Sequence, residues 1–359
     1  MHPNSTKNGL KGRQNCTKHT SPILNFRTLT DTSVGDYREQ SETAVKSATG
    51  EQVEKIEDVS GAAHKTFAVS TADSQLIVKF CHQEKNEHRF RSAPAALRTV
   101  DAVPTPDLIH FDGTRSVVLE PFIVISYEEG QVLNLGGSPD FRYVSEARKR
   151  SLSIDIGRRL GVLHRENKMA EFGRLEYENG EAKLDSRRSW PDLYLEILKE
   201  EQLAQMSEPF QDLVPMLERW LEDNISFLET GCSPCLVHQD LKIDNMIVGR
   251  REVRSIIDWE RAISGHPELD LFTTDGRLFF ALTSRTARKY RPYLYRGYFD
   301  ERSLQQGWKT RREFYKLMKT VEAMWTFKGW SVDIEDTEAV EKQLRQTMRR
   351  QINHIEGLM

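Results

Sequence analysis

The hydrophobic and polar positions of the chain follow two different periods. From 53 to 80, short apolar runs alternate with polar turns, which predicts three strands joined by a tight loop and a turn. The apolar run 116–127, interrupted by Pro121, predicts two buried strand segments around a bend. Later in the chain, apolar residues recur three or four positions apart, as amphipathic helices require. This helical spacing occurs in 152–163, 193–198, 213–221 and 314–325.

A further strand pattern interrupts the helical part. Met246 to Val248 and Val253 to Ile257 are short apolar runs, and Gly249 to Glu252 between them is typical of a turn. The hairpin that this pattern predicts would bring Asp258 back beside Asn245. Both side chains would then face one cleft.

The loop before this hairpin carries polar residues at a spacing that suits phosphoryl transfer. Asn245 lies five residues after Asp240, and Asp258 lies thirteen residues after Asn245. Transfer of a γ-phosphoryl group needs a carboxylate that orients the attacking hydroxyl, together with oxygen ligands for magnesium. The alternative is structural, with Asp240 and Asn245 as turn residues that bond their own backbone. The whole cluster favours the catalytic interpretation.

The cluster resembles the signature of the aminoglycoside phosphotransferase and choline kinase family. Its His-x-Asp-x-x-x-x-Asn loop is matched by 238–245 and its Ile-Asp-Trp-Glu strand end by 257–260. The resemblance implies an α+β fold of two lobes similar to protein kinases, with a small antiparallel β-sheet N-lobe and a larger, mainly helical C-lobe. On this basis 1–50 is an extension, 51–127 the nucleotide-binding N-lobe, and 128–359 the C-lobe with the catalytic loop and acceptor site.

The same resemblance implies a role for each residue of the cluster. Asp240 would be the catalytic base, and Asn245 and Asp258 would be the ligands of Mg²⁺. His238 would be a structural brace of the loop. Asp270, in the segment Gly-His-Pro-Glu-Leu-Asp-Leu, looks like the family's next landmark, which typically buttresses the catalytic loop.

The loop departs from the family at two positions. Many members have Gly after the first His and a His two residues after the Asp, whereas this chain has Gln239 and Lys242. Asp240 and Lys242 are therefore arranged more as in protein kinases. A lysine at this position would reach the γ-phosphate as a point charge. Its alternative is an exposed lysine on a loop.

The N-lobe pattern predicts where the nucleotide, ATP or GTP, would bind. The loop that begins with Ser60 and Gly61 would present backbone amides and a hydroxyl to phosphate oxygens. Lys79 closes an apolar strand, where the kinase arrangement would place its ammonium near the α- and β-phosphates. By the resemblance, backbone groups from Ser126 to Glu128 would meet the adenine ring.

The usual glutamate partner of this lysine is missing at its expected position. Kinases pair the lysine with a glutamate on the following helix, and the aligned position here is Ala93. Glu84 and Glu87 are nearby substitutes. Either one of them serves through a shifted helix, or Lys79 lacks its usual partner.

Three carboxylates bear on the choice of acceptor. Glu260, Glu268 and Asp270 follow the catalytic loop closely and would lie near the acceptor side. Acidic pockets favour cationic acceptors such as amino sugars or choline-like amines by charge complementarity. We therefore expect Glu260 and Glu268 to contact a cationic small molecule.

Composition excludes several other classes. The net charge of -3, without a dominant basic stripe, argues against a nucleic-acid binder. No run approaches the ~20 apolar residues of a membrane span, and 1–20 lacks the apolar core of a secretory signal, so a cytoplasmic protein with reduced thiols is expected. Cys232 and Cys235 form a C-x-x-C pair, but no second pair accompanies it at zinc-ligand spacing. The polar composition of 1–50 predicts either a mobile tail or an extension that caps a lobe and is partly helical from about Ser41.

These observations predict a small-molecule O-phosphotransferase that uses Mg²⁺ and a nucleoside triphosphate. A protein serine/threonine kinase is the alternative, but Asp258 is followed by Trp259-Glu260 instead of Phe-Gly. A non-catalytic nucleotide-binding pseudokinase is the third possibility, and only Ala93 favours it.

Overall fold

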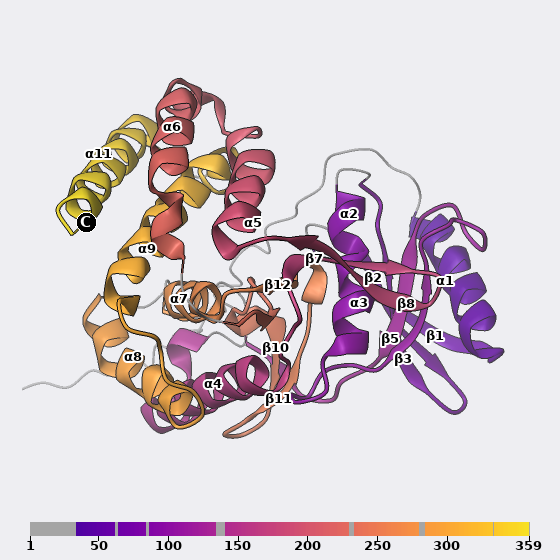
Figure 1. Cartoon of the computed structure of the whole chain (residues 1–359). Coiled ribbons are helices and arrows are strands. Elements are labelled where there is room, and N and C mark those ends of the chain that lie inside the picture. The colour runs from indigo at the N-terminus through magenta and orange to yellow at the C-terminus, as the bar shows by residue number, and fades with distance from the viewer. Residues whose placement is uncertain are drawn as a thin grey trace, which may run out of the picture.

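The computed structural model describes residues 34–61, 64–83, 86–133, 141–229, 233–279, 284–332 and 334–358. Figure 1 shows a smaller lobe built on a twisted sheet and a larger lobe built mainly of helices. The predicted α+β architecture is confirmed. The helix α11 (Thr337–Glu356) lies at the end of the large lobe that is remote from the sheet.

The small lobe contains an antiparallel sheet of five strands in the order β1-β2-β3-β5-β4. The first three strands fall where the apolar pattern predicts them. In β3, Leu76, Val78 and Phe80 are buried on one face. Side chains alternate along a strand, so Lys79 points to the opposite face. The strands are β1 (Val53–Asp58), β2 (Lys65–Thr71), β3 (Gln75–Phe80), β4 (Leu108–Asp112) and β5 (Phe122–Ser126).

The helix α1 (Val34–Thr49) covers the apolar face of this sheet (Figure 1). Ala44 and Val45 are fully buried in a cluster with Phe67 and Phe80. The helix begins before the predicted position near Ser41. Within the predicted extension, this helix therefore packs as a cap on the sheet, while 1–33 lies outside the described residues.

One strand prediction is wrong. Residues 116–120 form bends, and only Phe122–Ser126 of the apolar run is a strand. Asp112 accounts for the difference, because its carboxylate accepts hydrogen bonds from the backbone amides of Ser116 and Val117 at 2.9 and 3.0 Å. Those bonds close a local turn that competes with strand pairing. The strand β4, which the pattern did not predict, pairs with β5 instead.

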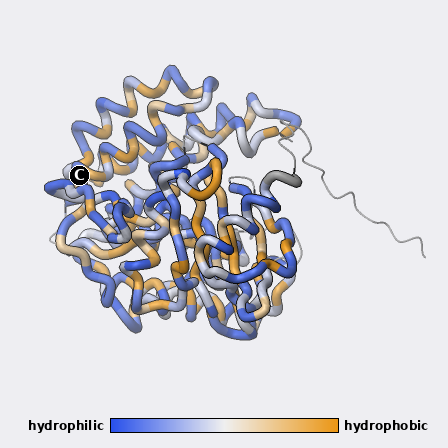
Figure 2. The backbone as a smooth tube through the Cα atoms, turned by 90° about the vertical axis from the view of Figure 1, so that its right-hand side faces the viewer, coloured by the Kyte–Doolittle hydropathy of each residue, from blue (hydrophilic) through white to orange (hydrophobic). Residues whose placement is uncertain are grey.

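The large lobe is built from helices whose apolar faces meet in one core, as the helical spacing predicts. Figure 2 shows hydrophobic and hydrophilic positions alternating along these helices. α4 and α8 pack so closely that a Cβ atom at Gly157 or Gly297 would overlap the backbone of the other helix. The main helices are α4 (Glu146–Glu166), α5 (Trp190–Ile197), α6 (Val214–Asn224), α7 (Pro267–Leu278), α8 (Ser284–Phe299) and α9 (Trp308–Trp325).

A long hairpin of β7 (Phe172–Glu178) and β8 (Glu181–Arg187) leaves the large lobe and runs beside α3 (Ser92–Thr99) (Figure 1). This hairpin was not predicted from the sequence, although Asn179-Gly180 is typical of its turn. Both residues have positive φ, at 53° and 85°, as the two-residue hairpin turn requires. The Ser92 hydroxyl donates to the Leu175 carbonyl at 2.9 Å and ties the hairpin to α3.

Among the residues that the structure describes, no helix has the length and apolar character needed to cross a membrane. Cys81 and Cys235 are buried free thiols. Cys232, the other half of the C-x-x-C pair, lies outside the described residues.

The packing of α1 generates a stability prediction. Val45→Asp places a carboxylate in the apolar cluster beneath the sheet, and we expect it to lower the free energy of unfolding by about 3 kcal/mol or more. Lys46→Asp, one position along on the exposed face of the helix, should cost about 1 kcal/mol or less. Urea denaturation followed by circular dichroism measures both. Equal destabilisation by the two variants would show that α1 does not support the sheet.

Candidate active site

The strand β9 (Cys235–Val237) leads into the predicted catalytic loop, and the hairpin of β10 (Met246–Val248) and β11 (Val253–Ile256) follows it. Met246 pairs with Ile256 in this hairpin. The Ile257 amide then donates to the Asn245 carbonyl at 3.0 Å. The hairpin therefore brings Asp258 back beside Asn245, as the apolar pattern predicts.

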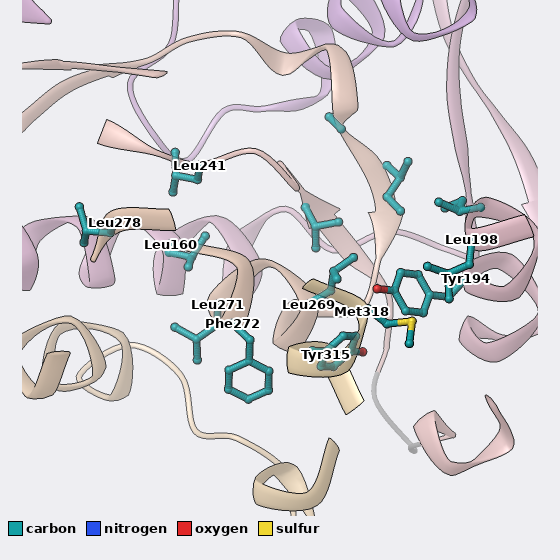
Figure 3. Close-up of a cluster of buried hydrophobic side chains, with 14 of the residues drawn as sticks. Leu160, Tyr194, Leu198, Leu241, Leu269, Leu271, Phe272, Leu278, Tyr315 and Met318 are labelled. Carbon is teal, nitrogen blue, oxygen red and sulfur yellow. The ribbon is translucent and has the colours of Figure 1, made fainter. Parts of the chain in front are cut away.

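Buried leucines fix the loop on the helical core. Figure 3 shows Leu241 reaching down from the loop towards Leu160 of α4 and Leu278 of α7. Leu241 is 1% exposed. The loop is thus anchored in its middle, and its polar side chains on either side of Leu241 are positioned by packing.

Asp270 in the first turn of α7 holds the start of the loop. Its carboxylate accepts hydrogen bonds from the backbone amides of His238 and Gln239 at 2.7 and 2.8 Å, and His164 Nε2 lies at 3.2 Å. Burial would raise the pKa of Asp270, but these hydrogen bonds and the nearby histidines lower it. Asp270 therefore lies against the start of the loop, and its role as the family's buttress stays a prediction.

His238 connects the loop to the segment that carries Asp258. Burial lowers the pKa of His238, so the ring is neutral at pH 7. Its Nε2 donates to the Ile257 carbonyl at 3.0 Å, and its Nδ1 accepts from the Asp240 amide at 3.2 Å. Both ring nitrogens are therefore used in holding the backbone, and the role of His238 as a brace of a catalytic loop stays a prediction.

Asp240 and Asn245 lie together at the end of the loop. The Asn245 side-chain amide donates to the Asp240 carbonyl at 2.9 Å and to its carboxylate at 3.3 Å. Asp240 lines a cavity of about 210 Å³ together with Lys242, Asp258 and Glu260. The Lys242 ammonium lies 3.9 Å from the Asp240 carboxylate, at the rim of this cavity.

Lys79 reaches from the sheet of the small lobe to two carboxylates that line the same cavity. Its ammonium pairs with the Asp258 carboxylate at 2.9 Å and with Glu260. Burial would lower the pKa of Lys79, but the two carboxylates raise it above its usual value. Burial would likewise raise the pKa of Asp258, yet Lys79 lowers it to about 2. Both groups are charged at neutral pH.

Among the described residues, the glutamate that pairs with Lys79 is therefore Glu260, whereas the sequence suggested Glu84 or Glu87 as substitutes. Glu87, in α2 (Glu87–Phe90), pairs with Arg91 at 2.9 Å and with Arg115 at 2.8 Å instead. Ala93 is buried in α3, and Glu84 lies outside the described residues. The expectation that Glu260 contacts the acceptor also differs from this geometry, because both of its oxygens face the small lobe.

A left-handed residue turns Glu260 towards Lys79. Asp258 has φ 66° and ψ 60°, a conformation that few residues besides glycine adopt. The short helix Trp259–Arg261 follows, and the buried Trp259 indole donates to the Ile256 carbonyl at 2.9 Å. This turn brings Glu260 within 2.7 Å of His64 Nε2, so Glu260 contacts two residues of the small lobe.

The predicted nucleotide contacts of the small lobe lie at two separate places. The Ser60 hydroxyl accepts from the Thr66 amide at 3.0 Å, so it closes its own loop between β1 and β2. Gly61 lies at the tip of that loop with open space around it. At the end of β5, the Ser126 hydroxyl donates to the Glu128 carboxylate at 3.0 Å.

The expectation for Glu268 is corrected by the structure. Glu268 is 1% exposed, and its two carboxylate oxygens accept from the Arg311 guanidinium at 2.7 and 2.6 Å. A buried carboxylate with this partner is not available to an acceptor. The prediction rested on closeness in sequence, which α7 overrides by turning Glu268 into the core.

Sequence reasoning also missed three charged residues beside the loop. Arg277 of α7 pairs with the Asp240 carboxylate and, at 2.7 Å, with Glu322 of α9. Lys319 of α9 pairs with Glu322 as well. The sequence offered no signal for this, because the residues come from helices that the loop meets only in the folded chain.

Comparison with protein-family models gives one match that covers most of the chain. The model described as the phosphotransferase enzyme family matches residues 55–314. The matched range includes the sheet of the small lobe, the catalytic loop and the helices beneath it.

Solved structures share the fold. A protein assigned as a fructosamine-3-kinase from Haemophilus somnus 129PT aligns with a TM-score of 0.58 and 13% identity, over 89% of this chain and 97% of that chain. The streptomycin–ATP complex of APH(2″)-IIa aligns with a TM-score of 0.53 and 16% identity, over 90% and 99%. At these identities the likeness shows the fold alone. The predicted kinase-like architecture is confirmed.

Curated relatives are longer proteins. The rat protein named acyl-CoA dehydrogenase family member 11 is 26% identical over 171 residues, which is 47% of this chain and 20% of the relative. The mouse protein of the same name is 28% identical over 163 residues, 44% and 18%. This chain therefore matches about a fifth of the length of these relatives.

The buried histidines around the loop generate a pH prediction. Burial lowers the pKa of His164, His238 and His266, the last to about 3, whereas unfolded histidine has a pKa of about 6.5. Below that value the unfolded chain binds more protons than the folded chain, so stability falls as the pH falls. Each histidine contributes about 1.4 kcal/mol per pH unit to this slope.

We expect His266→Gln to reduce the slope of unfolding free energy against pH by about 1.4 kcal/mol per pH unit between about pH 6 and pH 4, which corresponds to the loss of one proton-binding group. His354→Gln, at an exposed position of α11, is the matched control. Urea denaturation at a series of pH values measures the slopes. An unchanged slope in His266→Gln would contradict the assignment of a neutral, buried ring.

Proposed function

Because this chain belongs to the phosphotransferase enzyme family, we propose that it transfers the γ-phosphoryl group of ATP or GTP to a hydroxyl group of a small-molecule acceptor. The carrying observation is the meeting of Lys79 from the small lobe with Asp258 beside Asp240. A cation from the small lobe is thus paired with two of the carboxylates that line the cavity, Asp258 and Glu260. Phosphoryl transfer depends on such positioning more than on covalent chemistry.

In the proposed reaction the acceptor oxygen forms a bond to the γ-phosphorus while the bond to the β–γ bridging oxygen breaks. The nucleoside diphosphate leaves with that oxygen. Asp240 receives the hydroxyl proton, and Asn245 holds the Asp240 carboxylate in place through its amide. Lys79 binds the phosphates from the side of the small lobe.

The oxygen donors of the cavity fit a magnesium ion. Asp258 lines the cavity, and the backbone hydrogen bond from Ile257 to Asn245 keeps Asn245 beside it. Carboxylate and amide oxygens are ligands that Mg²⁺ prefers. When bound with the nucleotide, the metal would neutralise charge on the phosphate oxygens. Asn245 and Asp258 would hold it.

We assign Glu260 as the partner that positions Lys79, in place of the helix glutamate. Its second oxygen is held by His64, so the carboxylate is fixed between two groups of the small lobe. This assignment removes the main argument for a pseudokinase, because Lys79 does not lack a carboxylate partner. A protein substrate is the alternative acceptor, and no observation in the described part of the chain favours it.

The first test measures transfer directly. We expect the purified protein, with Mg²⁺ and ATP or GTP, to add phosphate to a small alcohol detected by mass spectrometry. Asp240→Asn keeps the shape of the side chain but removes the base, and it should lower turnover by about 10²- to 10⁴-fold with near-normal nucleotide affinity. Turnover equal to that of the unchanged protein would remove Asp240 from the mechanism.

A second test addresses Lys79 positioning. Glu260→Gln removes the charge that faces Lys79, and we expect it to raise the Kd for nucleotide by about tenfold, since a bond to a charged group is worth about 1.5–3 kcal/mol. Glu87→Gln is the matched control, because Glu87 pairs with arginines outside the cavity. Nucleotide affinity is measured by calorimetry. A larger effect of Glu87→Gln would restore the helix glutamate as the partner.

A further inference from the structure

A second cavity lies on the side of the catalytic loop that faces α7 and α9. It is lined by cationic side chains, here called the basic cluster, namely Arg261, Arg277 and Lys319, together with a single carboxylate, Glu322. Gln239 of the catalytic loop also lines it. The cavity is small, about 30 Å³, so it would admit only a small group of an acceptor, and that group would meet these charges directly.

Positive charge exceeds negative charge in this cavity. Glu322 lies 2.7 Å from Arg277 and 3.6 Å from Arg261, and it also pairs with Lys319. Within the lining of the cavity one carboxylate therefore faces three cations, and Asp240 pairs with one of them, Arg277, from outside it. Burial, with Arg277 and Arg261 close by, lowers the pKa of Lys319 to about 8. Burial alone would raise the pKa of Glu322, but the three cations hold the pKa of Glu322 far below its usual value.

The basic cluster is joined to the reacting centre through Arg277. Its guanidinium bridges the Asp240 carboxylate and Glu322. The acceptor hydroxyl must come within hydrogen-bonding reach of Asp240 to lose its proton. The rest of an acceptor bound there would lie against Arg277.

The triphosphate does not explain the whole cluster. The cavity of Asp240 and Asp258 shares only Arg261 with it, in the described part of the chain. Arg277 and Lys319 lie on the side of the α7 and α9 helices. The carboxylates once expected to attract a cationic acceptor are engaged elsewhere, Glu260 with Lys79 and Glu268 with Arg311.

We infer that the acceptor is an anionic alcohol, whose hydroxyl faces Asp240 and whose carboxylate or phosphate group binds Arg277 and Lys319. This inference rests on the proposed phosphotransferase function. An anionic group replaces the internal carboxylates as the partner of Arg277, which frees Asp240 to receive the proton. A guanidinium binds either kind of anion through two parallel hydrogen bonds, so carboxylates and phosphates are both suited to the site.

The test uses a small-molecule cell extract separated on an anion-exchange column before reaction. Each fraction is incubated with the full-length protein, Mg²⁺ and ATP or GTP, and new phosphate esters are detected by mass spectrometry. We expect the acceptor in the retained fraction. Transfer to the unretained fraction alone would overturn the anionic acceptor while leaving the phosphotransferase function intact, and transfer to neither fraction would overturn both.

Matched alcohols separate the two anion classes. Glycerate is compared with glycerol and 3-amino-1,2-propanediol, and glucose 6-phosphate with glucose and glucosamine. Within the series that reacts, we expect the anionic member to have a kcat/KM at least about tenfold above the others. A cationic or neutral member that reacts fastest would overturn the inference.

Variants of α9 locate the effect. Lys319→Gln should raise the KM for the retained acceptor by about tenfold and leave the KM for nucleotide unchanged, and Lys319→Arg should restore most of the loss because it keeps the charge. Lys316→Gln is the control. Lys316 lies one turn before Lys319 on α9, is half-exposed, and pairs with Glu313 at 2.8 Å. Thermal unfolding confirms that each variant is folded. An unchanged acceptor KM in folded Lys319→Gln would overturn the assignment of the cluster.

Discussion

The contact of Lys79 with Asp258 and Glu260 is the interaction on which the geometry of the cleft depends. It joins the sheet of the small lobe to the turn after β11, and it is partly shielded from water, with Lys79 18% exposed. Removing one partner of such a pair leaves an uncompensated charge, which costs far more than the pair contributes net. The two lobes are therefore held in a relation that keeps Asp258 facing the cavity. His64 extends the contact, because it binds the same Glu260 from the small lobe.

The sequence predicted what local patterns determine. The hairpin after Asn245 and the first three strands follow from apolar runs and turns, and the helices follow from their spacing. The partner of Lys79 could not be predicted in this way. Glu260 is distant in sequence, and it reaches Lys79 only because Asp258 adopts a left-handed conformation. The missed hairpin at Asn179-Gly180 differs, since its signal was present in the sequence and was not used.

Backbone conformation also explains one departure from the family pattern. Gln239 has φ 60°, a region that favours glycine, and glycine is common at this position in the family that the loop resembles. A non-glycine residue there costs of order 1 kcal/mol. The Gln239 amide donates to Asp270 at 2.8 Å, and its side chain donates to the Arg261 carbonyl at 2.9 Å, and the second of these bonds offsets the cost. A glycine would keep only the first bond.

The side chain of Gln239 thus ties the catalytic loop to the residue that lines both cavities. Arg261 follows Glu260 directly, so one short helix carries a carboxylate towards the small lobe and a cation towards α9. The two charges point apart because successive residues of a 3-10 turn, with three residues per turn, lie about 120° apart. In the proposed function, the same turn would organise the nucleotide side and the acceptor side. A change in the backbone at Asp258 would alter both sides together, whereas a change at Lys319 of α9 would alter the basic cluster alone.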